Sequence, residues 1–189
     1  MMPRPKPGAI EILSAEAAKH GFDESCAPET GMLLRMLAAA KPKGRMLNLG
    51  TGFGLSCAWL LDGMSRDSEL WTVDIDETGS AAAKEKLDQR LHVVVEDGVS
   101  FMKGALSIGR RFDLIFADAM PGKYDHLELA LDLVALGGFY VVDDLTPTPD
   151  WPEGAALAPK LTGLLHADPR FISLDLDWST GHLIAVRTE

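Results

Sequence analysis

The chain has 189 residues, of which 47% are hydrophobic and 24% are charged, and its formal net charge at pH 7 is −10. A chain of this length favours one domain with a sizeable core, so we expect a single domain over residues 1–189. The negative charge would repel a phosphate backbone, which disfavours nucleic acid as a partner. No stretch reaches the roughly 20 apolar residues that span a bilayer, and the start of the chain lacks a signal-peptide pattern. We therefore expect a cytoplasmic protein without a membrane partner.

The first 42 residues carry two helical patterns. Apolar side chains recur at helical spacing through residues 8–20 and stop at Gly21, and a second helix is expected over residues 28–40. The segment 1–42 either packs on a sheet or covers a ligand site, and the sequence leaves both interpretations open.

A glycine turn separates a short strand from a helix at residues 45–59, RMLNLGTGFGLSCAW. Glycines at positions 50, 52 and 54 allow unusual backbone dihedrals and let a ligand approach closely. Free N–H groups of the helix that starts at Leu55 face the same place. The spacing is GxGxG and not the GxGxxG of dinucleotide sites, which favours a nucleoside ligand. A tight turn without a ligand is the alternative.

Strands and helices alternate through the rest of the chain. Apolar runs predict strands over residues 69–73, 91–95, 112–117 and 139–142, with helices through AAAKEKL, to about residue 106 and over residues 124–136. After a proline-rich loop, a helix is expected from about Ala158, because Pro159 interrupts the pattern. Strands over residues 171–176 and 182–186 enclose the turn DWSTG. The prediction is an α/β fold with a doubly wound, mostly parallel, seven-stranded sheet and an antiparallel C-terminal strand.

Acidic residues follow several of these strands, at the edge where parallel sheets bind ligands. Asp74 lies 24 residues after Gly50 (74 − 50), close to the roughly 20-residue spacing at which an acid meets ribose hydroxyls. Asp97 is placed to meet an exocyclic amine, whereas Asp76 is expected to cap the helix that follows it. Helix capping alone would also explain Asp74 and Asp97, so both interpretations stay open.

Three further acids, Asp118, Asp143 and Asp144, end the fourth and fifth predicted strands. These strands are expected to be neighbours, so the three carboxylates are expected to converge. Close carboxylates repel unless one takes up a proton or a cation binds them, and oxygen ligands suit Mg²⁺ or Ca²⁺. We therefore predict a divalent metal site here. The alternative is that these acids cap the turns that follow them.

Five motifs resemble, in order and spacing, those of class I S-adenosylmethionine-dependent methyltransferases. They are NLGTGFGLS, TVDID, VVEDG, FDLIFADA and GGFYVVDDL. The chain is most similar to the catechol O-methyltransferase-like family, and the likeness covers about residues 25–187. The resemblance implies a Rossmann-like methyltransferase fold, one methyltransferase domain over residues 1–189, and S-adenosylmethionine as the cofactor.

By this resemblance, the glycine turn would lie against the methionine part of the cofactor, with Ser56 near its carboxylate, Asp74 at the ribose and Asp97 beside the adenine. The implied cofactor-binding set is Asn48, Gly50, Thr51, Gly52, Gly54, Ser56, Asp74, Ile75, Asp97, Gly98 and Asp118. The implied metal ligands are Asp118, Asp143 and Asp144.

The chain departs from the family pattern at two places. Asn48 stands where the family usually has glutamate, which is expected to change how the glycine turn is supported. The family's metal-binding aspartate is followed by a lysine thought to act as base, in a DADK-like run. Here the run is DAMPGKY, with Met120 and Pro121 in those places and Lys123 two residues later. Proline cannot move a proton.

The resulting hypothesis is metal-assisted O-methylation of a small hydroxylated acceptor, phenolic or catechol-like, with Asp118 and Lys123 as catalytic residues and His126 as an alternative base. One alternative is an S-adenosylmethionine-binding protein of the same fold that has lost the metal or base chemistry. Another is a nicotinamide-dependent oxidoreductase, which the GxGxG spacing and the antiparallel tail disfavour. Trp151 and Trp178 either line the acceptor site or pack in the core. The sequence leaves open whether the protein forms a homodimer.

Overall fold

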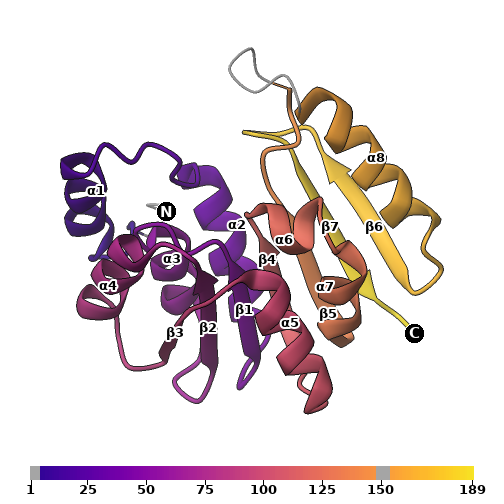
Figure 1. Cartoon of the computed structure of the whole chain (residues 1–189), viewed down its shortest axis with the longest axis horizontal. Helices are drawn as coiled ribbons and strands as arrows, with labels where there is room; N and C mark the ends of the chain where they lie inside the picture. Colours follow the sequence, from indigo (N-terminus) through magenta and orange to yellow (C-terminus); the bar gives the residue numbers. More distant parts are fainter. Residues whose placement is uncertain (1–4, 148–153) are drawn as a thin grey trace.

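The structure, a computed structural model, describes residues 5–147 and 154–189. Its centre is a seven-stranded sheet with the strand order β3-β2-β1-β4-β5-β7-β6 (Figure 1). The strands are β1 (Arg45–Leu49), β2 (Glu69–Asp74), β3 (Leu91–Val95), β4 (Phe112–Ala117), β5 (Val134–Val142), β6 (Phe171–Leu176) and β7 (His182–Arg187). The strands β1 to β5 pair in parallel, whereas β7 runs antiparallel to both of its neighbours. The predicted fold class is therefore confirmed, including the reversed C-terminal strand.

Helices cover both faces of the sheet (Figure 1). They are α1 (Ile10–Lys19), α2 (Pro28–Ala39), α3 (Leu55–Gly63), α4 (Glu77–Lys86), α5 (Gly98–Ser107), the short α6 (Met120–Lys123), α7 (Leu127–Leu133) and α8 (Gly154–Ala167). Side chains of α2 and α3 form one core cluster with one face of the sheet, and those of α5, α7 and α8 form another with the opposite face. Helix α1 packs on α3 in a third cluster.

Alternation along each strand explains how one sheet supplies two cores. In β4, Leu114 and Phe116 join the cluster with α2 and α3, whereas Ile115 and Ala117 join the cluster with α5 and α7. Successive side chains of a strand point to opposite faces, and burial on both faces is typical of a central strand in a parallel sheet. Strand β4 is the middle strand of the seven. Asp118, which follows it, therefore lies at the centre of the carboxyl edge.

Strand β5 begins earlier than the sequence predicts. It starts at Val134, and α7 ends at Leu133, whereas the apolar spacing predicts a helix to residue 136 and a strand over residues 139–142. Pairing with β4 explains the difference, because Val134 pairs with Phe112 before a bulge lets the two strands resume their register. Sheet pairing therefore overrides the helical spacing of this segment.

Helix α8 also begins earlier than predicted, at Gly154 instead of about Ala158. Pro159 consequently lies inside the helix, where its ring removes one backbone hydrogen bond at a cost of roughly 3 kcal/mol. Leu161 and Leu165 of the same helix are 2% and 0% exposed, and burial of a leucine side chain contributes ~1.5–3 kcal/mol. Packing against the sheet thus offsets the local penalty.

Two further expectations from the sequence concern the aromatic wall at Trp151 and the absence of a membrane-spanning helix. Trp151 and most of the proline-rich loop lie outside the described residues, so the aromatic wall predicted there is not tested. Among residues 5–147 and 154–189, no helix combines the length and the apolar character that a bilayer crossing requires.

Candidate active site

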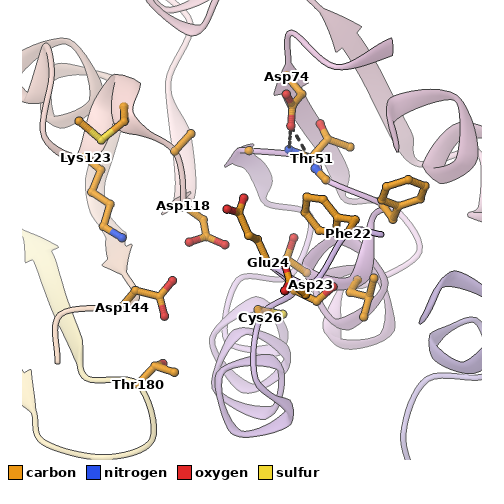
Figure 2. A pocket seen from close by; sticks show the side chains of 18 of the residues that line it. Phe22, Asp23, Glu24, Cys26, Thr51, Asp74, Asp118, Lys123, Asp144 and Thr180 are labelled. Carbon is orange, nitrogen blue, oxygen red and sulfur yellow. Dashed lines mark hydrogen bonds between the residues drawn. The ribbon is translucent and has the colours of Figure 1, made fainter. Parts of the chain in front are cut away.

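A cavity of about 810 Å³ opens at the carboxyl ends of the parallel strands (Figure 2). Four parts of the chain form its walls: the glycine turn with the end of β2, the segment after β4, the end of β5 with the turn between β6 and β7, and the connection between α1 and α2. The lining residues, in that order, are 50–53, 55, 56, 74 and 76; 118–120, 123 and 124; 144, 146, 179 and 180; and 22–26. Open parallel sheets bind their ligands at this edge.

Asp74 holds the glycine turn in place. Its Oδ2 atom accepts hydrogen bonds from the N–H groups of Thr51 (2.7 Å) and Gly52 (3.0 Å), which are drawn in Figure 2. Its Oδ1 atom accepts a third from the N–H of Asp76 at 3.0 Å. The structure thus brings together the turn and the acid that the nucleoside hypothesis needs on one face. The contact of Asp74 with a ribose stays a prediction.

The glycines of the turn are required by their protein neighbours. At Gly50 (φ +100°) an added Cβ would lie 2.7 Å from the carbonyl oxygen of Asp118, and at Gly54 (φ +88°) it would lie 2.7 Å from the Cβ of Ala83. Side chains at such positive φ are strained as well. Gly54 does not line the cavity. It instead lets α3 begin against α4, so its predicted approach to the cofactor has no support in this geometry.

Asn48, in β1, forms hydrogen bonds that support the glycine turn. It is fully buried in β1, and its amide nitrogen donates hydrogen bonds to the carbonyl of Gly50 (2.7 Å) and to Oγ1 of Thr72 (2.9 Å). The Thr72 hydroxyl also lies 2.8 Å from the hydroxyl of Thr51. Asn48 does not line the cavity. The asparagine that stands in place of the family's glutamate therefore still forms a hydrogen bond with the turn, but it carries no charge.

The acids after β2 and β3 act as helix caps. Asp76 caps α4 as predicted, and the carboxylate of Asp97 accepts a hydrogen bond from the Ser100 N–H at 2.9 Å at the start of α5. This hydrogen bond lowers the pKa of Asp97. Asp97, Gly98 and Ile75 are not among the residues that line the cavity, and Ile75 is 75% exposed. Their predicted contacts with the cofactor stay predictions.

The connection between α1 and α2 forms a wall of the cavity; a cover over the ligand site was one of the two interpretations of residues 1–42, but the sequence did not single out these residues. Residues 22–26 line it, and Figure 2 shows Glu24 pointing towards Asp118. The ring of Phe22 lies 5.3 Å from that of Phe53, centroid to centroid, which ties the connection to the glycine turn. The N-terminal segment therefore both packs on α3 and reaches over the cavity. Its only sequence signal is a pair of acids between Gly21 and the start of α2.

Asp118, Lys123 and Asp144 face one another across the second half of the cavity (Figure 2). Burial raises the pKa of Asp118 to about 8, although the nearby charge of Lys123 opposes this rise. Burial also raises the pKa of Asp144, helped by the charge of Asp143 and opposed by that of Lys123. Asp144 has a φ of +55°, a conformation that non-glycine residues adopt rarely and often at functional sites.

Asp143 points away from this group into a buried network. Its side chain is 1% exposed, and Oδ1 accepts hydrogen bonds from the Thr180 hydroxyl and from the Asp144 N–H (2.8 Å). Nε2 of the buried His182 lies 3.0 Å from the same oxygen and 2.9 Å from the hydroxyl of Thr30. Burial alone would raise the pKa of Asp143, but the hydrogen bonds from His182 and Thr180 hold it below its ordinary value.

The three predicted metal ligands are not assembled around one point. Among the described residues, no group of three or more histidine, cysteine, aspartate or glutamate side chains is arranged to hold a metal ion. Asp143 is engaged with His182 and does not line the cavity, and the ammonium of Lys123 lies near Asp118 and Asp144. The donor set therefore does not fit the predicted divalent cation, and we derive no step through one.

Two other predicted candidates lie away from the cavity. His126 is exposed at the start of α7 and does not line the cavity, so its predicted role as base lacks geometric support. Trp178 is 47% exposed and does not line the cavity. Its carbonyl lies 3.1 Å from Nδ1 of His182, and its ring lies 5.7 Å from the His182 ring. Trp178 therefore belongs to the network behind Asp143.

The sequence and the fold were compared with those of known proteins. Residues 47–145 match the family described as a methyltransferase domain. A protein of Mycobacterium ulcerans (strain Agy99), provisionally named an O-methyltransferase, is 30% identical over 167 residues, with 74% of this chain and 71% of that protein covered. A protein of Mycobacteroides abscessus with the same provisional name is 27% identical over 203 residues, with 95% and 91% covered.

Two solved structures share the fold. The O-methyltransferase TomG from Streptomyces achromogenes, in complex with S-adenosylmethionine, has a TM-score of 0.82 at 21% identity, with 98% of this chain and 92% of that chain covered. The O-methyltransferase from Bacillus cereus, in complex with S-adenosylhomocysteine, has a TM-score of 0.81 at 21% identity, with 100% and 93% covered.

The chain belongs to the methyltransferase family, among its class I, catechol O-methyltransferase-like members. It is accordingly an S-adenosylmethionine-dependent O-methyltransferase. The family match leaves the oxidoreductase alternative without support.

Proposed function

We propose that the protein transfers the methyl group of S-adenosylmethionine to a hydroxyl of a small phenolic or catechol-like acceptor bound in the cavity. One observation carries this proposal: a single cavity contains both the glycine turn with Asp74 and the group Asp118, Lys123 and Asp144. Two reactants held side by side react in an effectively unimolecular step, which removes much of the entropic barrier.

In this proposal the cofactor occupies the half of the cavity above β1 and β2. The nucleoside lies on Gly50 and Gly52 with its ribose at Asp74, as the family resemblance implies. The carboxylate of the methionine part lies near Ser56, in the first turn of α3. The free N–H groups and the dipole of a helix N-terminus favour an anion at that place.

The acceptor occupies the half between Asp118 and the turn that joins β6 and β7. Hydroxyl groups of Thr146 and Thr180 line this half, together with the apolar parts of Met120 and Tyr124. An apolar wall with a few polar groups suits a small ring that carries hydroxyls. This composition supports a phenolic acceptor.

The chemistry requires little covalent help from the protein. The acceptor oxygen forms a bond with the methyl carbon while the S–CH₃ bond breaks, and the bonding electron pair stays on sulfur, giving S-adenosylhomocysteine. The hydroxyl proton leaves to a carboxylate of the site or to water. The protein must hold the oxygen in line with the S–CH₃ bond and stabilise the negative charge that develops on it. The described residues do not fit the divalent cation that the family pattern predicts, and no step above depends on one.

The proposal is tested with S-adenosylmethionine labelled in its methyl group and a panel of phenols and catechols. We expect Asp118→Ala to lower turnover at least about 100-fold, because it removes a carboxyl group that can accept the proton of the reacting hydroxyl. We expect S-adenosylhomocysteine binding to change far less than turnover. Asp67→Ala, at an exposed position between α3 and β2, is the matched control.

The same experiment separates the proposal from its main alternative. Binding of S-adenosylhomocysteine without turnover of any acceptor would favour a cofactor-binding protein with lost chemistry, an alternative that the substitutions Met120 and Pro121 in the family motif support. Failure to bind S-adenosylhomocysteine would contradict both.

A further inference from the structure

The backbone next to Lys123 is fixed by several contacts. The N–H of Gly122 (φ +84°) donates to the carbonyl of Asp125 at 2.7 Å, and the carbonyl of Gly122 accepts a hydrogen bond from the Tyr140 hydroxyl. A Cβ at Gly122 would overlap Cδ1 of Leu49, so this position accommodates only glycine. Lys123 itself is 5% exposed. A long, flexible side chain is therefore held at one place in the cavity wall.

The amine end of Lys123 points towards two carboxylates that end neighbouring strands, Asp118 after β4 and Asp144 after β5 (Figure 2). The charge of Lys123 acts on both and favours their ionised forms, against the effect of burial. Glu24 adds a third negative charge to the same space. Within the described residues, Lys123 is the one lysine, arginine or histidine that lines the cavity.

Asp143 is held by buried partners at one of its two carboxylate oxygens. Its Oδ1 atom already interacts with His182, with the Thr180 hydroxyl and with the Asp144 N–H. Removing a buried carboxylate from a paired imidazole would leave a buried polar group without its partner, which costs several kcal/mol. The acid that the family pattern assigns to a metal is thus used to join β5 to β7.

We propose that the ammonium of Lys123 is the resident cation of this active site and takes the electrostatic role that a divalent ion would have, so that methyl transfer needs no added metal. The inference rests on the proposed function, because it assigns the charge stabilisation in that reaction. It also separates Lys123 from the role of base, in which the amine would have to be neutral before the reaction.

A fixed ammonium stabilises the acceptor oxygen without reorganisation during the reaction, because the protein has already oriented the charge. As the O–CH₃ bond forms and the S–CH₃ bond breaks with its electron pair left on sulfur, the hydroxyl proton passes to a carboxylate of the site or to water, and not to Lys123. Lysine suits this role as a compact point charge with three donors.

The first test needs no acceptor. Mn²⁺ is titrated by calorimetry into the complex of the protein with S-adenosylhomocysteine. We expect no saturable Mn²⁺ site in the wild type. We expect Lys123→Met to bind Mn²⁺ at least about tenfold more tightly than the wild type, because the variant lacks the positive charge that repels the cation from the two carboxylates. Lys103→Met, at an exposed position of α5, is the matched control and should behave as the wild type. A saturable one-to-one Mn²⁺ site in the wild type would overturn the proposal.

The second test measures turnover with and without a chelator. We expect equal wild-type turnover in both, at least about a 100-fold loss in Lys123→Met, and partial recovery in Lys123→Arg, which keeps the charge. If Lys123→Met does not fold, the turnover of the wild type and of Lys123→Arg, each with and without chelator, still tests the proposal. Turnover that is lost in chelator and restored by Mn²⁺ overturns the proposal. Lack of turnover with every acceptor contradicts the proposed function instead, while the Mn²⁺ titration still tests Lys123, so the two failures are distinguishable.

Discussion

Single residues shape the cofactor half of the cavity, and Asp74 does so most directly. Its carboxylate accepts hydrogen bonds from the N–H groups of Thr51 and Gly52. Asp74→Asn keeps the shape but removes the charge and one acceptor. We expect the affinity for S-adenosylhomocysteine, measured by calorimetry, to fall about tenfold or more, since a hydrogen bond to a charged group contributes ~1.5–3 kcal/mol. Asp67→Asn is the control, and an unchanged affinity would show that Asp74 does not shape the site.

Asp168 is a second residue with a measurable contribution, in this case to stability. Its carboxylate accepts hydrogen bonds from the side chain and the N–H of Arg170, which also pairs with Asp132 in α7. The hydrogen bonds from Arg170 lower the pKa of Asp168. Since the folded pKa lies below the unfolded value of about 3.9, this contribution is full above about pH 4 and is lost as the pH falls through the folded pKa.

We therefore expect Asp168→Asn to lower the free energy of unfolding by about 1 kcal/mol at neutral pH. The difference from the wild type should narrow as the pH falls below about 4. Urea unfolding at several pH values measures it. A difference that stays constant down to the lowest pH would rule out the ionised Asp168 as its source.

At the scale of secondary-structure elements, α6 depends on β5 for its position. The Tyr140 hydroxyl of β5 donates to the carbonyl of Gly122 in α6, and both residues are buried. In Tyr140→Phe this carbonyl loses its donor, so we expect a loss of ~1–3 kcal/mol in the free energy of unfolding. Because α6 carries Lys123, turnover should also fall, with S-adenosylhomocysteine affinity unchanged.

The control for Tyr140→Phe is Ser107→Ala, which removes an exposed hydroxyl that donates to the carbonyl of Gly104 in α5. Chemical unfolding and steady-state turnover measure both variants. If Tyr140→Phe costs no more stability than Ser107→Ala and turns over normally, α6 is positioned by other contacts.

At the scale of the whole molecule, charge restricts the acceptor. The chain carries a net charge of −10, and carboxylates of Asp23, Glu24, Asp118 and Asp144 line the cavity beside Lys123. We expect kcat/KM for a catechol with an amine side chain to exceed that of its carboxylate analogue at least about tenfold, with a smaller ratio at high salt. Equal or better use of the carboxylate would contradict this.

Local patterns explain which features the sequence could predict. Most strands were predictable because apolar runs end at acids, and Asp76 was predictable as a cap because α4 follows it directly. The start of β5 at Val134 was not, because its pairing with Phe112 depends on a strand elsewhere in the chain. Helical spacing carries no information on that partner.

Side-chain direction explains what the sequence could not predict in the site. Asp143 and Asp144 are adjacent in the sequence, yet one turns into the core and the other faces the cavity. The choice depends on His182 and Thr30, which come from β7 and α2. The sequence allowed the N-terminal segment to cover the site but did not identify residues 22–26 as the wall, because a connection between helices has no periodic pattern.

The most direct test of the central claim is a crystal structure of the complex with S-adenosylhomocysteine. We expect the nucleoside above β1, in contact with Gly50, Gly52 and Asp74, and the sulfur atom facing the space beside Asp118 and Lys123. A nucleoside bound outside this cavity, or a sulfur atom turned away from Asp118, would contradict the account.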